Sequence, residues 1–158
     1  MRHPPMEKVL VSPIQVIVLS RIPGKYETYP PLWNLLPGLR KKYKLGIINN
    51  GTRLTFPYFD LKFGLSEKFD LILSSGAEGV RKPDPEIYLR ASKRLGVDPQ
   101  RCLFMDDSNI HVEGARRVGM CAVLWPDREE GFRRFEEQLR SDGMETGSAG
   151  LPPVDQGE

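Results

Sequence analysis

Two adjacent carboxylates, Asp106 and Asp107, follow the short apolar run 102–105 and are the clearest candidates for chemistry in the sequence. Such a run is typical of a short buried strand. Two carboxylates at its end repel each other with little water to screen them, so they need a cation, a basic partner or a shared proton. Mg²⁺ would suit them, because it takes oxygen ligands and is commonly held by one or two carboxylates. The alternative is a solvated turn in which Asp-Asp-Ser-Asn caps the next helix.

Polar residues also follow two other apolar runs. The Asn-Asn-Gly-Thr segment 49–52 comes after the run 45–48, and Ser74-Ser75 ends the segment that starts at Phe69. The carboxyl ends of parallel strands share one edge of a sheet, and ligands bind at that edge. Three polar clusters at one edge therefore predict a site. For the Asn-Gly pair, the alternative is a hairpin turn back through Leu54.

Strands alternate with helices along the chain, which predicts βα units and a parallel sheet flanked by helices. The expected strands are 14–19, 45–48, 69–74, 102–105 and 120–124. The expected helices are 32–43, 84–95, 112–118 and a segment from Asp127 to beyond Leu139. Asp84 is suited to cap the second of these helices, and Gly96 follows its end. Pro37 and Gly38 interrupt the first helical pattern and can kink or restart it.

Length and composition indicate a single α/β domain. The chain has 158 residues and a formal charge of +2, without a long run of one sign, so nothing indicates nucleic acid. No apolar run reaches the length of a membrane span, so we expect no membrane partner. Cys102 and Cys121 lie in apolar contexts, which is typical of reduced core cysteines in a cytoplasmic protein. We expect a loose lead-in over 1–8, an α/β core over 9–141 and a disordered tail over 142–158.

Three segments together resemble the haloacid dehalogenase superfamily of mostly Mg²⁺-dependent hydrolases. Leu-Gly-Ile-Ile-Asn-Asn-Gly at 45–51 looks like its second motif, and Val-Arg-Lys-Pro-Asp-Pro at 80–85 looks like its third. Leu-Phe-Met-Asp-Asp-Ser at 103–108, with the downstream Glu-Gly-Ala and Val-Gly-Met, resembles its fourth. The resemblance covers about residues 35–125, with the motifs in the family's order. It implies a Rossmann-like parallel sheet of the haloacid dehalogenase type.

The resemblance implies roles for the charged residues. Lys82 would act in catalysis by neutralising charge on the phosphoryl group and on an aspartate nucleophile. Asp107, and with it Asp106, would hold Mg²⁺. Some relatives have another acid where this chain has His111, and we expect His111 to be a surface residue of the following helix.

It also implies a phosphate-binding turn. Asn49 stands where the family usually has Ser or Thr, and its amide would donate a hydrogen bond to a phosphoryl oxygen. Backbone N–H groups at Asn50 and Gly51 would assist it. The ligand implied is a small phosphorylated metabolite.

The family's first motif is missing. That motif is a strand ending in Asp-x-Asp, whose first acid attacks phosphorus and whose second is the general acid and base, yet no Asp precedes Asp60. We expect residues 15–19 to fill the central strand position all the same, because an empty position would leave two buried strand edges unpaired. Ser20 and Arg21 would then stand in place of the acids, and Arg21 could pair with Asp106 or Asp107 and replace the metal.

Two function classes follow. The first is a haloacid dehalogenase-like, phosphatase-type hydrolase that is impaired because its nucleophile is missing. The second is a non-catalytic binding or regulatory module, or a truncated copy of a full-length hydrolase. About twenty-five residues separate Leu19 from the run at 45–48, so a full cap domain does not fit. All these interpretations require the amine of Lys82 to lie close to Asp106 and Asp107.

Overall fold

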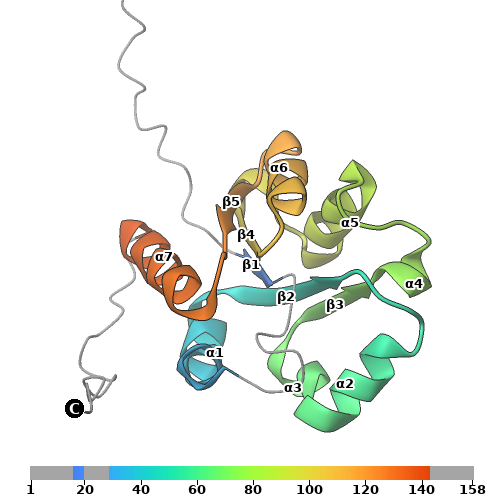
Figure 1. Ribbon diagram of the computed structural model, residues 1–158, viewed down its shortest axis with the longest axis horizontal. Coiled ribbons are helices and arrows are strands. Elements are labelled where there is room, and N and C mark those ends of the chain that lie inside the picture. The colour runs from blue at the N-terminus through green and yellow to red at the C-terminus, as the bar shows by residue number, and fades with distance from the viewer. Residues whose placement is uncertain (1–15, 20–28, 143–158) are drawn as a thin grey trace, which may run out of the picture.

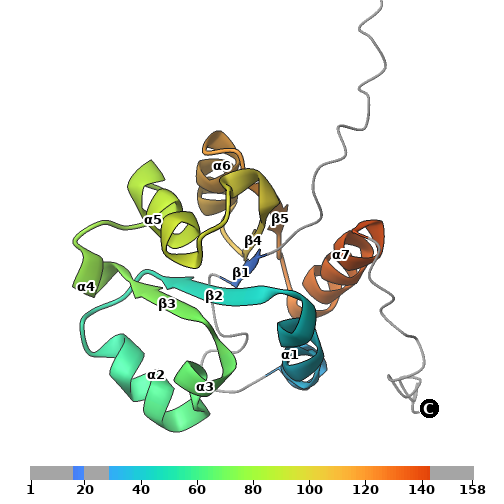
Figure 2. The same cartoon turned by 180° about the vertical axis from the view of Figure 1, so that it is seen from behind.

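The computed structural model describes residues 16–19 and 29–142, which form a parallel sheet with helices on both faces (Figures 1 and 2). The sheet has five strands in the order β3-β2-β1-β4-β5. The strands are β1 (Val16–Leu19), β2 (Lys44–Asn49), β3 (Leu71–Ser74), β4 (Cys102–Asp106) and β5 (Cys121–Leu124). The predicted α/β class with a parallel sheet flanked by helices is confirmed.

The helices cover the sheet in two groups. One face carries α1, α2, α3 and α7, and the other carries α5 and α6 (Figures 1 and 2). The helices are α1 (Pro30–Lys42), α2 (Thr55–Phe63), α3 (Leu65–Lys68), α4 (Ser75–Glu78), α5 (Pro85–Leu95), α6 (Asn109–Arg117) and α7 (Arg128–Ser141), with a 3₁₀ turn at Pro99–Arg101. Each group buries one apolar cluster against the sheet.

The side chains of β4 divide between these two clusters. Leu103 and Met105 pack on the face covered by α1 and α7, whereas Cys102 and Phe104 pack on the face covered by α5 and α6. Successive side chains of a strand point to opposite faces, so a strand covered on both sides must be apolar throughout. Asp106 is the next residue, and it is as deeply buried as the apolar residues before it.

β1 occupies the centre of the sheet. Val16–Leu19 pairs in parallel with β2 on one side and with β4 on the other. The hypothesis that this segment fills the central position is therefore confirmed for residues 16–19. Ser20, Arg21 and the predicted pairing of Arg21 with the acids lie outside the described residues.

Helix boundaries follow capping chemistry. The Asp84 side chain accepts a hydrogen bond from the N–H of Glu86 at the start of α5, and Gly96 ends that helix with a positive φ of 69°. At the start of α7, Asp127 accepts from the N–H of Glu130. Both starts agree with the sequence, because acidic side chains satisfy N–H groups that have no partner within the helix.

The structure excludes two local alternatives that the sequence left open. Pro37 does not restart α1, which continues from Pro30 to Lys42 and buries Leu32, Leu36 and Leu39. The burial of these three leucines offsets the cost of the backbone hydrogen bond that is lost at Pro37. The Asn-Gly pair after β2 does not form a hairpin, because β2 pairs in parallel with both neighbours and the chain continues into α2.

Other expectations are tested only in part. Cys102 is buried and Cys121 is half-buried, and both are free thiols. Within residues 16–19 and 29–142, no helix has the length and apolar character needed to cross a membrane. The predicted lead-in at 1–8 and residues 143–158 of the predicted tail lie outside the described residues.

Candidate active site

The carboxyl edge of the sheet brings Lys82 and Asp106 into contact. Lys82 lies on the loop before α5, and Asp106 is the last residue of β4. The Lys82 Nζ atom lies 3.0 Å from Asp106 Oδ2, and the two side chains are 4% and 1% exposed. The convergence predicted for the lysine and the first acid is therefore observed. Asp107 follows at the exposed end of the strand.

Several protein groups surround the Asp106 carboxylate. Oδ2 contacts Lys82 Nζ and also lies 2.9 Å from His111 Nδ1. Oδ1 accepts the backbone N–H of Ser108 at 2.8 Å. Burial acts to raise the pKa of Asp106, but the Lys82 ammonium and hydrogen bonds from Ser108 and Asp107 outweigh burial, so this pKa lies below its ordinary value. Asp106 is thus an ionised carboxylate with both oxygens engaged.

Asn50 fixes the loop that carries Lys82. Its side-chain Oδ1 accepts the backbone N–H of Lys82 at 2.9 Å, and its Nδ2 donates to the Lys82 carbonyl at 3.0 Å. This pair of bonds ties the end of β2 to a loop more than thirty residues later in the chain. The side chain of Asn50 therefore positions the lysine, and the predicted contribution of its backbone N–H to phosphate binding stays a prediction.

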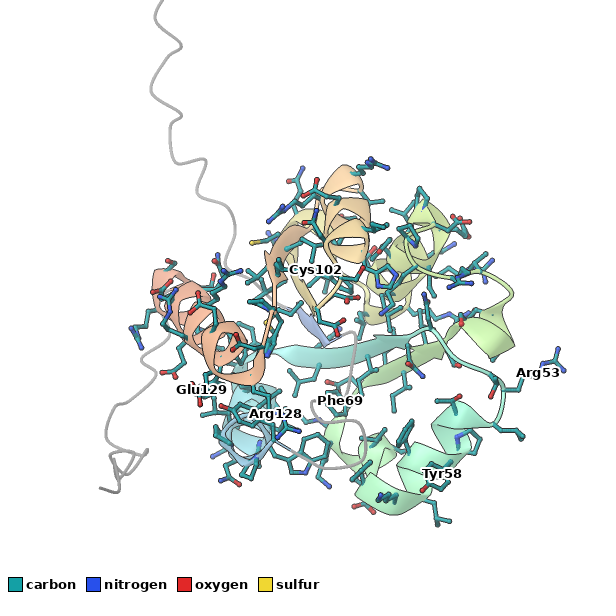
Figure 3. All side chains as sticks on the ribbon, in the orientation of Figure 1. Arg53, Tyr58, Phe69, Cys102, Arg128 and Glu129 are labelled. Atoms are coloured by element: carbon teal, nitrogen blue, oxygen red, sulfur yellow. The ribbon has the colours of Figure 1, made fainter. Side chains whose placement is uncertain are left out.

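The turn at Gly51 is held against α4. The N–H of Gly51 donates to Ser75 Oγ at 2.9 Å, and that hydroxyl lies 3.1 Å from the Gly51 carbonyl. A Cβ on Gly76 would lie 2.6 Å from the backbone of Thr52 and Arg53, so only glycine permits this approach. Arg53 points away from the sheet on the outer side of the turn (Figure 3).

Asn49, the last residue of β2, is half-buried beside this turn. Its Nδ2 atom would lie 2.9 Å from a Cβ on Gly51, so the amide stands directly over the glycine. Asn49 is thus placed at the predicted edge of the sheet. The Gly51 N–H, in contrast, already has an acceptor in Ser75, and the phosphate-binding roles assigned to both residues stay predictions.

His111 lies on α6 as expected, but its side chain belongs to the cluster and not to the open surface. Its side chain is 23% exposed and contacts Asp106 from the first turn of α6. α6 approaches closely because Gly114 has no side chain; a Cβ there would lie 2.9 Å from both Pro83 Cβ and the hydroxyl of Tyr88. That hydroxyl donates to the carbonyl of His111 at 2.8 Å. The sequence signal for this packing was a histidine followed three residues later by a glycine, shortly after the acidic end of a strand.

The family model of the haloacid dehalogenase-like hydrolases matches residues 4–119 of the chain. The chain belongs to this family. The predicted membership is confirmed.

Several phosphatases are similar to this haloacid dehalogenase-like chain in part. The putative phosphatase YhcW of Bacillus subtilis (strain 168) is 38% identical over 76 residues, which cover 48% of this chain and 34% of YhcW. Phosphatase MT3486 of Mycobacterium tuberculosis is 40% identical over 86 residues, or 54% of this chain and 40% of that protein. The glyceraldehyde 3-phosphate phosphatase of Methanopyrus kandleri is 32% identical over 97 residues, which cover 60% of this chain and 42% of that protein. The chain thus spans well under half the length of these relatives.

Solved structures share the fold. A haloacid dehalogenase-type phosphatase from Thermococcus onnurineus matches with a TM-score of 0.58 and 36% identity, over 62% of this chain and 46% of its own. A protein from Corynebacterium glutamicum has a TM-score of 0.71 at 24% identity. The match covers 85% of this chain and 98% of that protein. A family enzyme from Bacteroides thetaiotaomicron, in complex with magnesium and inorganic phosphate, has a TM-score of 0.56 at 24% identity, over 61% of this chain and 53% of its own.

Magnesium in a family structure raises the question of whether these residues fit the ion. Within the described part of the chain, no group of three or more His, Cys, Asp or Glu side chains is arranged to hold a metal. Asp106 offers no oxygen that lacks a donor. Mg²⁺ demands a near-octahedral set of oxygens at about 2.1 Å. The described residues around Asp106 therefore do not fit the ion, and Mg²⁺ ligation by Asp107 stays a prediction.

Proposed function

We propose that this chain is a haloacid dehalogenase-like hydrolase domain whose phosphatase turnover is strongly impaired. One observation carries the proposal. β1 stands in the centre of the sheet, beside the strand that ends in Asp106, yet no Asp precedes Asp60. In the sequence, Ser20, Arg21 and Ile22 follow this central strand where the family has Asp-x-Asp.

The chemistry explains why this difference matters. A carboxylate nucleophile divides phosphate ester hydrolysis into two easier steps through an aspartyl-phosphate. A serine hydroxyl at the first position needs a base to activate it, and with Ser20 there the second acid of Asp-x-Asp, which would serve as base, falls on Ile22. Lys82 is retained, but it is paired with Asp106. Without the nucleophile, the groups that only bind the substrate provide a small fraction of the rate acceleration that the complete set of catalytic residues provides.

A gain-of-function experiment tests the proposal. Hydrolysis of p-nitrophenyl phosphate is measured with MgCl₂ for the wild type and for Ser20→Asp/Ile22→Asp, which restores two carboxylates. Ser20→Asn/Ile22→Asn is the matched control, because it has the same side-chain size without the charge. We expect no turnover by the wild type or the control, and measurable turnover by the aspartate variant that is lost when Lys82→Met is added. Wild-type turnover that Asp107→Ala abolishes would overturn the proposal.

A second candidate is a binding module for a small phosphorylated metabolite. It is favoured by the presence of Asn49 and Lys82 on one edge of the sheet, and by relatives named for the phosphatase reaction on glyceraldehyde 3-phosphate. Binding would raise the melting temperature of the wild type in inorganic phosphate but not in chloride at equal ionic strength. Asn49→Leu should remove the difference. An equal response in both salts would exclude this candidate.

Three further expectations remain predictions of this proposal. They are a cytoplasmic location, the absence of nucleic-acid partners and the absence of membrane partners. A formal charge of +2 over 158 residues supports the second of them, since proteins that bind nucleic acid through its phosphates usually carry a strong basic patch.

A further inference from the structure

His111 separates this site from a conventional metal site. A carboxylate that ligates Mg²⁺ must direct an oxygen lone pair at the ion. Here Oδ2 of Asp106 is approached from two sides, by Lys82 Nζ at 3.0 Å and by His111 Nδ1 at 2.9 Å. The remaining oxygen accepts the N–H of Ser108, which holds the carboxylate in one orientation. A cation at Oδ2 would displace the imidazole and would also lie close to the lysine ammonium.

Burial makes these contacts necessary. The Asp106 side chain is 1% exposed, so its charge receives almost no stabilisation from water. An ionised carboxylate in such a place needs compensating charge and hydrogen bonds from the protein or from a bound cation. Lys82 supplies a charge and a hydrogen bond from the loop before α5, and His111, the more exposed of the two partners, supplies a second hydrogen bond from the first turn of α6. The cluster is therefore complete without an ion.

We propose that His111, with Lys82, takes the place of a divalent cation at Asp106, so that this chain holds its carboxyl edge together without Mg²⁺. The inference rests in part on the proposed function, because the missing Asp-x-Asp removes the other carboxylates that would share the ion. His111 acts as a positioning residue for Asp106. Asp107, on the exposed side of the strand end, is hydrogen-bonded to Asp106 and binds no Mg²⁺ by itself.

The test measures metal binding in the absence of any substrate. The melting temperature is recorded in EDTA and in excess MgCl₂, and Mg²⁺ binding is titrated by calorimetry. We expect no difference for the wild type. His111→Asp replaces the imidazole with a third carboxylate near Asp106 and Asp107, and its melting temperature should rise by about 2 °C or more in saturating Mg²⁺.

Two controls make the result specific. Ile110→Asp adds the same carboxylate one residue earlier, at a side chain that is 68% exposed, and should show no response to Mg²⁺. His111→Asn removes the imidazole without adding charge and should also show none. Circular dichroism in EDTA verifies that each variant is folded.

Two results would contradict the proposal that His111 and Lys82 replace the cation. The inference is overturned if the wild type binds Mg²⁺ and Asp107→Asn abolishes that binding, or if folded His111→Asp responds no more than Ile110→Asp. These readouts are independent of turnover. Wild-type hydrolysis without Mg²⁺ binding would overturn the proposed function alone, whereas Mg²⁺ binding without hydrolysis would overturn this inference alone.

Discussion

The carboxyl edge of the sheet and the outer surface of α7 both carry ion pairs, but in opposite surroundings. At the edge, Lys82 and Asp106 are 4% and 1% exposed and meet at 3.0 Å. On α7, Arg133 and Glu130 are 56% and 32% exposed and meet at 2.7 Å. Figure 3 shows how the charged side chains at the start of α7, including Arg128 and Glu129, lie on the outside of the molecule. Distance alone does not separate the two clusters.

Burial separates them. Charges on the surface of a helix are solvated whether or not they pair, so their pairing adds little to stability. Charges inside the protein have lost their water, and removing one partner leaves the other without compensation. We therefore expect substitutions in the edge cluster to reduce the stability of the protein strongly, whereas substitutions in the α7 pairs should change it little.

Removing the carboxylate charge should have the largest effect. Asp106→Asn keeps the side-chain shape but leaves the buried Lys82 ammonium beside a neutral amide. We expect a loss of about 3–5 kcal/mol in the free energy of unfolding, measured by urea denaturation. Adding Lys82→Met should restore much of this loss, because the uncompensated charge is then gone. A loss below about 1 kcal/mol for Asp106→Asn would place the pair in the same class as a surface ion pair.

Removing the imidazole should have a smaller effect. His111→Ala takes one hydrogen bond from Asp106, but Lys82 and Ser108 remain and water can enter at this partly exposed position. We expect a loss of about 1 kcal/mol in the free energy of unfolding. Ile110→Ala is the control on the same turn of α6, and it should be closer to neutral. If both variants lost the same free energy of unfolding, the loss would come from a general effect of substitution on this turn of α6 and not from the bond to Asp106.

Acid should remove the contribution of the buried pair in a defined range. The pKa of Asp106 lies below its ordinary value of 3.8. Its ionised form therefore contributes stability that is fully present above about pH 4 and is lost as the pH falls through the lower folded-state pKa. The difference in unfolding free energy between the wild type and Asp106→Asn should stay constant from neutral pH to about pH 5 and shrink below about pH 4. A difference that has already disappeared at about pH 6 would contradict the assignment of an ionised Asp106.

Breaking a pair on α7 should have the smallest effect. Glu130→Gln removes one carboxylate partner of Arg133 and of Arg134, and we expect a change in melting temperature close to the error of the measurement. Whatever change is seen should disappear in high salt, because ions screen exposed charges. The effect of Asp106→Asn should survive the same salt. A large, salt-resistant effect at Glu130 would remove the distinction between the two regions.

The sequence was most informative where chemistry is local. Asp84 and Asp127 predicted the starts of α5 and α7 because a capping carboxylate acts within three residues of its own position. The central position of β1 was predictable from its β-branched residues and from the cost of an empty strand position. The meeting of Lys82 and Asp106 followed from the rule that carboxyl ends of parallel strands converge.

The sequence was least informative where the result depends on how closely two elements pack. His111 reaches Asp106 only because α6 lies against Pro83 and Tyr88 at Gly114. Asn50 was predicted to assist phosphate binding through its backbone N–H, and nothing in the sequence indicated that its side chain bonds the backbone of Lys82. In both cases the side chain has two plausible partners, and tertiary distances decide which one it meets.

The most direct test of the missing nucleophile is a search for the covalent intermediate itself. The wild type and Ser20→Asp/Ile22→Asp are incubated with acetyl phosphate and Mg²⁺, and the intact proteins are weighed by mass spectrometry. The account predicts a phosphoryl adduct on the aspartate variant and none on the wild type. A wild-type adduct that forms at the same rate and is absent from Ser20→Ala would show that the chain has kept a nucleophile, and would contradict the account.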